Sequence, residues 1–232
     1  MPVKDNLSGY SIYSPLQRDK SKENPLKGSN SLFPELPDKK FEVIYADPPW
    51  DYNGKVQFDR TLNKDINRKY SKPIFMSSAS FKYPTMRLEE LTSIPISDIA
   101  DENCILFMWT TNPHLEQAIK LGNSWGFKYK TVAFVWNKMV HNPGQYTMSY
   151  CELCLLFKKG KIPERGARNV KQLVTAPRTG HSAKPLEVRE RINKIFPIQE
   201  KIELFARAKY EGWHSWGLEA SGDEQLFNLL LK

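Results

Sequence analysis

The sequence predicts an α/β protein whose mostly parallel sheet is covered by helices on both faces. Segments with strand character alternate along the chain with segments of helical periodicity, as in proteins built from β-α-β units. Several predicted strands are apolar throughout, which is typical of strands that are buried on both faces. The chain has 232 residues, a length that suits one α/β core.

The N-terminal part differs in composition from the rest of the chain. Residues 1–38 are polar and rich in proline, and we predict an extended or partly disordered arm there. Residues 39–232 then form the predicted folded domain. Neither a secretory leader nor an apolar run of membrane-spanning length is present, so we expect a cytoplasmic protein with no membrane partner.

The first predicted strand covers residues 41–46, an apolar and β-branched run. It ends at Asp47-Pro-Pro-Trp50, because proline cannot continue a hydrogen-bonded ladder. Residues 51–82 show no periodicity and are predicted to be a long loop, of the kind that acts as a lid or is disordered. Thr85 is the predicted N-cap of a short helix over 86–92.

The middle of the chain repeats this alternation. Residues 104–110 are a second buried strand, and Pro113 then begins a helix that ends near Gly126. Two further apolar runs predict strands over 129–136 and 151–157. The remaining predicted elements are a short strand at 172–176, a helix at 184–196, a strand at 202–205 and a terminal helix at 223–231.

The charge is unevenly distributed along a chain whose formal net charge is +8. The segment 158–171 is predicted to be a loop that grips a nucleic-acid backbone, because cations there outnumber acids. The alternative is a solvated loop with no partner. Its predicted phosphate contacts are Lys158, Lys159, Lys161, Arg165 and Arg168.

The three cysteines are too few for a disulfide scaffold. Cys151 and Cys154 have the spacing of a metal or redox pair, but no second pair exists and the surrounding residues read as a buried strand. We therefore predict a structural role for these cysteines and no metal.

Asp47 stands where active sites of α/β proteins lie, at the carboxyl end of a buried strand. An aromatic amine must pyramidalise to accept a methyl group, and two acceptors aimed at its N–H bonds favour that change. The Asp47 carboxylate and the Pro48 carbonyl suit this task, and Pro48 and Pro49 stiffen the loop. Trp50 offers a flat face for an unpaired base. The alternative is a plain turn with Trp50 in the core.

Several motifs occur together, and in this combination the sequence resembles the MT-A70 family of adenine-N6 methyltransferases over roughly residues 40–220. The matching stretches are Asp47-Pro-Pro-Trp50, Tyr83-Pro-Thr-Met86, Ile105-Leu-Phe-Met-Trp109, His181-Ser-Ala-Lys-Pro185, Lys201-Ile-Glu-Leu-Phe-Ala-Arg207, Gly212-Trp213 and Trp216-Gly217. The resemblance implies a Rossmann-like class I methyltransferase fold with permuted motif order, in which the catalytic loop precedes the cofactor strand.

The resemblance also implies S-adenosylmethionine as cofactor, with S-adenosylhomocysteine as product. Lys184 would lie beside the methionine part of the cofactor and near Asp47. Glu203, Phe205 and Arg207 would line the ribose and adenosine pocket. Tyr52 and Tyr83 would confine the target base together with Trp50.

One motif departs from the family pattern. Many relatives carry Asn after the final Trp-Gly pair, whereas this chain has Leu218 and then Glu219, so Glu219 is the candidate replacement for that cofactor contact. The prediction is transfer of a methyl group to N6 of adenine in DNA. RNA methylation, a catalytically silent nucleic-acid-binding subunit and N4-cytosine methylation are the alternatives. A homodimer is compatible with the resemblance.

Overall fold

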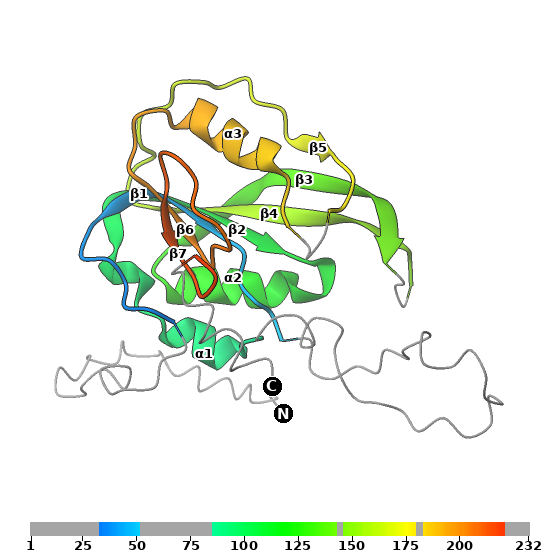
Figure 1. The fold of residues 1–232 in the computed structure, drawn as a ribbon, viewed down its shortest axis with the longest axis horizontal. Helices are drawn as coiled ribbons and strands as arrows, with labels where there is room; N and C mark the ends of the chain where they lie inside the picture. Colours follow the sequence, from blue (N-terminus) through cyan, green and yellow to red (C-terminus); the bar gives the residue numbers. More distant parts are fainter. Residues whose placement is uncertain (1–32, 52–84, 143–145, 180–182, 221–232) are drawn as a thin grey trace, which may run out of the picture. The chain divides into compact units, whose positions relative to one another are not determined.

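The structure, a computed structural model, describes residues 33–51, 85–142, 146–179 and 183–220. Within these residues seven strands form one sheet in the order β5-β3-β4-β2-β1-β6-β7 (Figure 1). The strands are β1 (Phe41–Ala46), β2 (Ala100–Thr110), β3 (Lys128–Asn142), β4 (Ser149–Lys159), β5 (Leu173–Thr175), β6 (Lys201–Leu204) and β7 (His214–Trp216). The helices are α1 (Leu88–Ser93), α2 (Leu115–Ser124) and α3 (Leu186–Ile195), with short 3-10 turns η1 (Ile96–Asp98) and η2 (Asn112–His114).

The sheet is mostly parallel, as predicted. β1 runs parallel to both of its neighbours, β2 and β6, and the pairs β3–β5 and β6–β7 are also parallel. Only β4 is reversed, since it pairs antiparallel with β2 and with β3. β7 is not among the strands predicted from the sequence, because a three-residue strand is too short to show a period.

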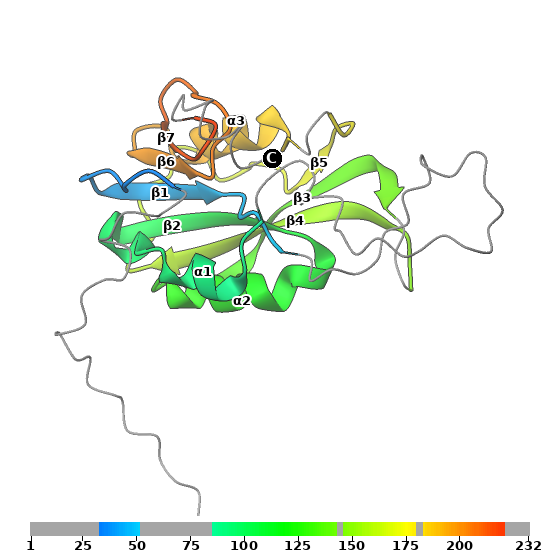
Figure 2. The same cartoon turned by 60° about the horizontal axis from the view of Figure 1, so that its bottom comes forward.

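Helices cover both faces of the sheet, which also confirms the prediction (Figure 2). Side chains alternate along β1: Ile44 and Ala46 pack in the core on the side of α1 and α2, whereas Val43 and Tyr45 pack on the side of α3. The same alternation runs along β2. Both cores are apolar, which explains why these strands read as uninterrupted hydrophobic runs.

Several predicted boundaries change. The short helix begins after Arg87 rather than after Thr85, and Glu90 closes its first turn by accepting a hydrogen bond from the Arg87 N–H at 2.7 Å. β3 and β4 are longer than predicted and continue toward each other as a hairpin. The predicted loop 51–82, apart from Asp51, and the terminal helix 223–231 lie outside the described residues.

The chain joins the folded unit at Phe33, six residues before the predicted start at 39. The Phe33 ring stacks on Trp216 with centroids 5.0 Å apart and meets Phe205 edge-on at 5.5 Å. The Trp216 indole N–H donates to the Pro34 carbonyl at 2.9 Å. These residues of the predicted arm are therefore part of the packed domain. Across the described residues, no helix is long and apolar enough to cross a membrane.

Candidate active site

Two strands bring the predicted catalytic and cofactor segments side by side. β1 and β6 are parallel neighbours, and Ala46 lies opposite Leu204. Asp47 and Phe205 therefore leave the sheet at the same edge, which we call the catalytic edge. This is the edge at which open α/β sheets bind ligands.

The loop that follows β1 is fixed by its own backbone. The Trp50 N–H donates to the Pro48 carbonyl at 2.9 Å, and the Pro49 carbonyl accepts from the Met86 N–H at 2.8 Å. Asp51 completes a bridge to the Met86 carbonyl at 3.2 Å. The Pro48 carbonyl keeps a second lone pair, so its use in this turn leaves one acceptor position for a substrate amine.

Trp50 is packed more deeply than a base platform would be. Its side chain is 6% exposed, and its indole N–H points to the Trp109 carbonyl at 3.3 Å. One face of the ring stacks on His114, with centroids 5.7 Å apart. Stacking of a base on Trp50 stays a prediction, and the geometry assigns this side chain to holding the loop.

His114 was not found by sequence reasoning, although it supports the loop from η2. One ring nitrogen lies 2.9 Å from the Thr111 hydroxyl and the other 3.2 Å from the Asp51 carbonyl. Burial lowers the pKa of His114, although the Asp51 carbonyl opposes that effect. The available signal was its position in the first turn after β2, a strand that ends at the catalytic edge.

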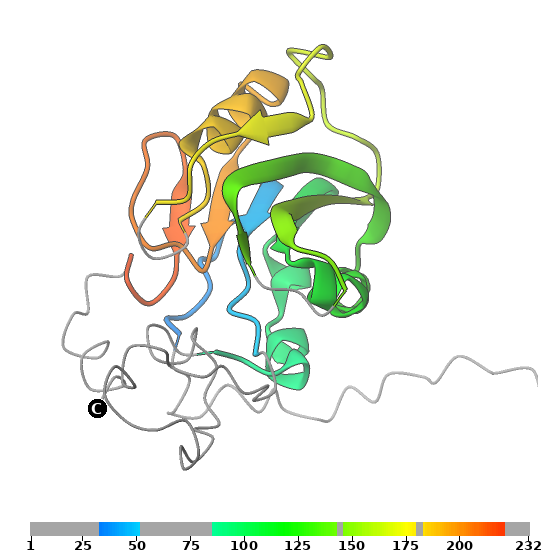
Figure 3. The same ribbon diagram turned by 90° about the vertical axis from the view of Figure 1, so that its right-hand side faces the viewer.

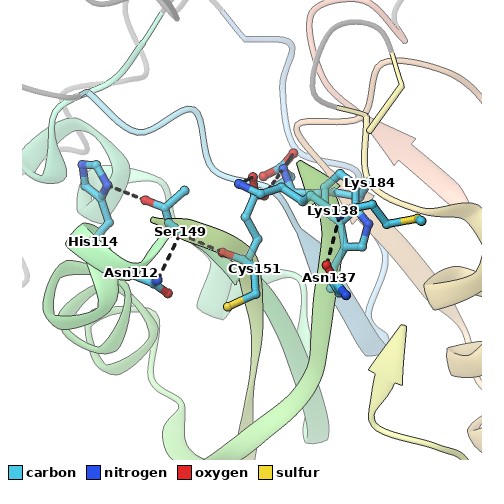
Figure 4. Close-up of polar contacts among 12 residues, drawn as sticks. Asn112, His114, Asn137, Lys138, Ser149, Cys151 and Lys184 are labelled. Atoms are coloured by element: carbon cyan, nitrogen blue, oxygen red, sulfur yellow. Dashed lines mark hydrogen bonds and ion pairs between the residues drawn. The ribbon is translucent and has the colours of Figure 1, made fainter. Parts of the chain in front are cut away.

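Four charged side chains of alternating sign form a row at the catalytic edge, and Figure 4 labels its two lysines, Lys138 and Lys184. The Lys184 Nζ lies 2.7 Å from Asp47 Oδ2 and 3.4 Å from Glu152 Oε2. The other Glu152 oxygen lies 3.4 Å from the Nζ of Lys138, whose side chain is 2% exposed. The row Asp47–Lys184–Glu152–Lys138 thus connects the catalytic loop to β4 and β3.

The charge of Lys184 is set by this row. Burial by itself lowers the pKa of Lys184, but the carboxylates of Asp47 and Glu152 outweigh burial and raise it above its ordinary value, while Arg207 opposes them. Lys184 is therefore a stable cation at neutral pH. It serves as a fixed positive charge and not as a base.

Glu203 carries a partner that the sequence did not reveal. Arg189 donates to both of its carboxylate oxygens, at 2.7 to 3.1 Å, and lies over the Tyr210 ring at 3.5 Å. Burial raises the pKa of Glu203, Arg189 opposes that rise and the charge of Asp47 adds to it. The ribose contact predicted for Glu203 stays a prediction, in which Arg189 would share the carboxylate.

The backbone after β6 is unusual. Phe205 has a φ of 59°, a left-handed conformation that is rare for an aromatic residue and is found most often at functional sites. Its ring is buried among Phe33 and Trp216, so the predicted adenosine contact is untested. Gly217 packs directly against the backbone of Ala206, since a Cβ at position 217 would lie 2.3 Å from the Ala206 carbonyl oxygen.

Other predicted cofactor residues lie near the same edge. Arg207 lies two residues after Phe205 and is partly buried, and its charge acts on Lys184. Glu219 is partly buried, whereas Leu218 is buried in the core. The predicted base contacts Tyr52 and Tyr83 fall outside the described residues.

The predicted phosphate-binding segment does not lie at this edge. Lys158 and Lys159 belong to β4 and not to a loop, and Lys159 pairs with Cys104 in the first half of β2, whereas Cys154 pairs with Trp109 near its end. Because β4 is antiparallel to β2, it carries these lysines to the edge opposite Asp47. The Lys161 backbone is held there by Asn103, at 2.7 Å.

Arg165 and Arg168 follow in the exposed loop that leads to β5. The loop rests on the C-terminal end of α3, where the Gly166 N–H donates to the Ile195 carbonyl at 2.9 Å. The structure therefore brings none of the five predicted phosphate contacts next to Asp47. Their role in binding a backbone stays a prediction.

Cys104 and Cys154 are core residues, whereas Cys151 is only partly buried. Cys151 and Cys154 are three positions apart on an extended strand, so their side chains point to opposite faces of β4. Burial raises the pKa of Cys104 to about 12 and that of Cys154 well above its ordinary value. Among the described residues, no cluster of three or more His, Cys, Asp or Glu side chains is arranged to hold a metal.

Comparison with known proteins identifies the family of this chain. A model of the MT-A70 family matches residues 41–219, which span every element from β1 to β7. The chain belongs to the MT-A70 family. The parallel pairing of β1 with β6 places the loop after β1 and the segment after β6 at one edge of this methyltransferase fold.

Individual relatives of this MT-A70 protein are both bacterial and eukaryotic. It is 55% identical over 218 residues to the type II methyltransferase M.MunI of Mycoplasma sp, covering 94% of this chain and 92% of the relative. It is 32% identical to the human N(6)-adenine-specific methyltransferase METTL4, over 78% of this chain and 38% of the relative. The catalytic subunit METTL3 of the human N(6)-adenosine-methyltransferase is 25% identical, and the chain covers 26% of it.

Proposed function

We propose that this methyltransferase transfers a methyl group from S-adenosylmethionine to the N6 amine of adenine in DNA. The observation that carries the proposal is the Asp47 carboxylate, which is held at the catalytic edge by Lys184 at 2.7 Å. The names of two relatives support the rest, since one is a type II methyltransferase and the other is N(6)-adenine-specific.

Asp47 and the Pro48 carbonyl are the acceptors for the two N–H bonds of the amine. Both are attached to a loop that is already anchored by Met86, so they need no reorganisation when the amine arrives. Accepting both hydrogens favours a pyramidal nitrogen with its lone pair free to attack. Lys184 keeps the carboxylate in place and contributes one positive charge beside it.

The residues around Asp47 fit the proposed cofactor. Lys184 and Arg207 would be the cations for its carboxylate, whereas Glu203 and Glu219 would be acceptors for its ribose hydroxyls. The close approach of Gly217 to the backbone after β6 shapes the neighbouring surface. When bound, S-adenosylmethionine supplies an electrophilic methyl group, so that no metal is required by the reaction.

The alternatives are separated by chemistry. An RNA substrate would use the same acceptors, and DNA is proposed because the type II relative shares nearly the full length of this chain. A silent subunit would have no need of an intact Asp47-Pro-Pro-Trp50 loop paired with Lys184. The catalytic loops of N4-cytosine methyltransferases more often begin with Ser. The loop in this chain begins with Asp47, and this difference argues against cytosine methylation.

The test is transfer from labelled S-adenosylmethionine to single- and double-stranded DNA and RNA oligonucleotides, with the product nucleoside identified by mass spectrometry. We expect N6-methyladenine in DNA, and a loss of at least about 100-fold in kcat for Asp47→Asn. Asp98→Asn, an exposed carboxylate at the opposite edge, is the matched control and should be fully active. Methylation of RNA alone, or of cytosine, would contradict the proposal.

A further inference from the structure

The β3–β4 hairpin extends beyond the rest of the sheet at the catalytic edge. The last pair between β2 and β4 is Thr110 with Leu153, yet β3 and β4 continue to pair at Asn137 with Cys151. The part of the hairpin from Asn137 and Cys151 outward consists of residues 137–142 of β3 and residues 146–151, and we call it the ribbon. Figure 1 and Figure 3 show β3 curving away from the sheet there.

The ribbon presents an unusual number of apolar side chains to solvent. Tyr146 is 91% exposed, Met148 is 63% exposed and Met139 is 58% exposed, and Val140 and Tyr150 are also exposed. Five of the twelve large exposed apolar side chains in the described residues are therefore in this one hairpin. Such a concentration marks a contact surface rather than ordinary solvated structure.

The backbone of the ribbon holds part of this surface outward. Met139 has a φ of 61°, a left-handed conformation that costs free energy in any residue with a side chain. Its N–H is satisfied by the Asn137 side chain at 3.0 Å (Figure 4). The left-handed conformation at Met139 is therefore energetically unfavourable for the backbone, and its side chain is exposed to solvent.

Charge distinguishes among the classes of partner. Residues 137–151 contain Lys138 and His141 but neither Asp nor Glu, although acids make up 26 of the 232 residues in the chain. A polyanion therefore meets no like charge on the ribbon. Exposed Tyr and Met side chains without carboxylates suit the faces of nucleic-acid bases, on which aromatic side chains stack without regard to sequence.

The ribbon is joined directly to the active site. At its root Lys138 pairs with Glu152, which lies beside Lys184 and hence beside Asp47. On the other side, the Asn112 side chain donates to the Ser149 hydroxyl at 3.2 Å (Figure 4). A DNA strand whose adenine reaches Asp47 must therefore pass close to the ribbon.

We propose that the ribbon is the docking surface for DNA next to the target adenine, with Tyr146 and Met148 packing against neighbouring bases. This inference rests on the proposed function, because it takes DNA as the substrate. It also assigns the gripping of DNA to an apolar hairpin at the catalytic edge, and not to the basic segment 158–171.

Equilibrium binding to a fluorescent adenine-containing DNA duplex tests the proposal without requiring turnover. For the double variant Tyr146→Ser/Met148→Ser we expect the Kd for DNA to rise about tenfold or more, since each stacked base contributes on the order of one factor of ten. Affinity for S-adenosylmethionine, measured by calorimetry, should not change. Tyr146→Trp should bind DNA normally, because it keeps a flat ring.

Ile198→Ser is the matched control, since Ile198 is 79% exposed but precedes β6 at the opposite edge. It should leave the Kd for DNA unchanged. An unchanged Kd in the double variant would overturn the proposal. So would a wild-type dimer that becomes monomeric in the variant while DNA affinity is retained, because the ribbon would then dock a second copy. A wild type that binds DNA through the ribbon without methylating it would contradict only the proposed function.

Discussion

Lys184 and Asp47 are 137 positions apart in the sequence, yet the Nζ of one lies 2.7 Å from the Oδ2 of the other. The contact joins the segment before α3 to the loop after β1. It also places Lys184 between two carboxylates of the charge row, since Glu152 lies on its other side. The position of the Asp47 carboxylate and the local charge beside it therefore both depend on Lys184.

Replacement of Lys184 by Met should lower kcat by about 100-fold, because Asp47 would lose the cation that positions it. The effect on KM for DNA should be small, since the lysine lies at the reacting amine and not at the ribbon. Steady-state methyl transfer measures both constants. Lys194→Met, at an exposed position of α3, is the control, and equal kcat values in the two variants would refute the expectation.

Replacement of Lys138 by Met should lower the free energy of unfolding by roughly 2 kcal/mol, because Glu152 would lose one of its two buried cations. The double variant Lys138→Met/Glu152→Gln should recover part of that loss. Urea unfolding of the three proteins gives the comparison. If Lys138→Met is as stable as the wild type, the pair contributes no net stability.

His114 should make stability depend on pH below neutrality. Burial holds its pKa below the ordinary value of 6.5, so the unfolded chain takes up a proton more readily than the folded chain. Stability from this residue is thus complete above about pH 6.5 and is lost as pH falls toward the folded pKa. Urea unfolding at pH 7 and pH 5 should show a smaller loss for His114→Phe, which keeps a ring against Trp50. Equal losses would exclude His114 as the cause.

Gly217→Ala should weaken cofactor binding and stability together. The new Cβ would lie 2.3 Å from the Ala206 carbonyl oxygen and 2.6 Å from its amide nitrogen, and backbone cannot yield as a side chain can. The segment after β7 must move away from the segment after β6. Calorimetry with S-adenosylmethionine should show at least about tenfold weaker binding. Ser215→Ala, in β7 itself, is the control, and normal binding by Gly217→Ala would argue against a cofactor site here.

The sequence was most informative where local rules decide the structure. The apolar run at 41–46 that stops at proline correctly predicted β1 and the loop carrying Asp47. The partners of Glu203 and Trp50 could not be predicted in this way. In the sequence, Arg189 is an ordinary residue within a helix and His114 is an ordinary residue at the start of one. Only the packing of distant segments brings them to the site.

The basic segment shows a different limit. The density of cations over 158–171 is visible in the sequence, but the edge of the sheet at which they lie depends on the direction of β4. An antiparallel strand in a mostly parallel sheet carries its C-terminal residues away from the catalytic edge. Local composition contains no information on that direction.

The position of β1 between β2 and β6 has a consequence for synthesis on the ribosome. Of the described strands β1 is the first to emerge, but its second neighbour, β6, begins only at Lys201. Until then one side of an apolar strand has unpaired N–H and C=O groups, an arrangement that invites pairing with other chains. A nascent chain that stalls before Lys201 should therefore be the most aggregation-prone form of this enzyme.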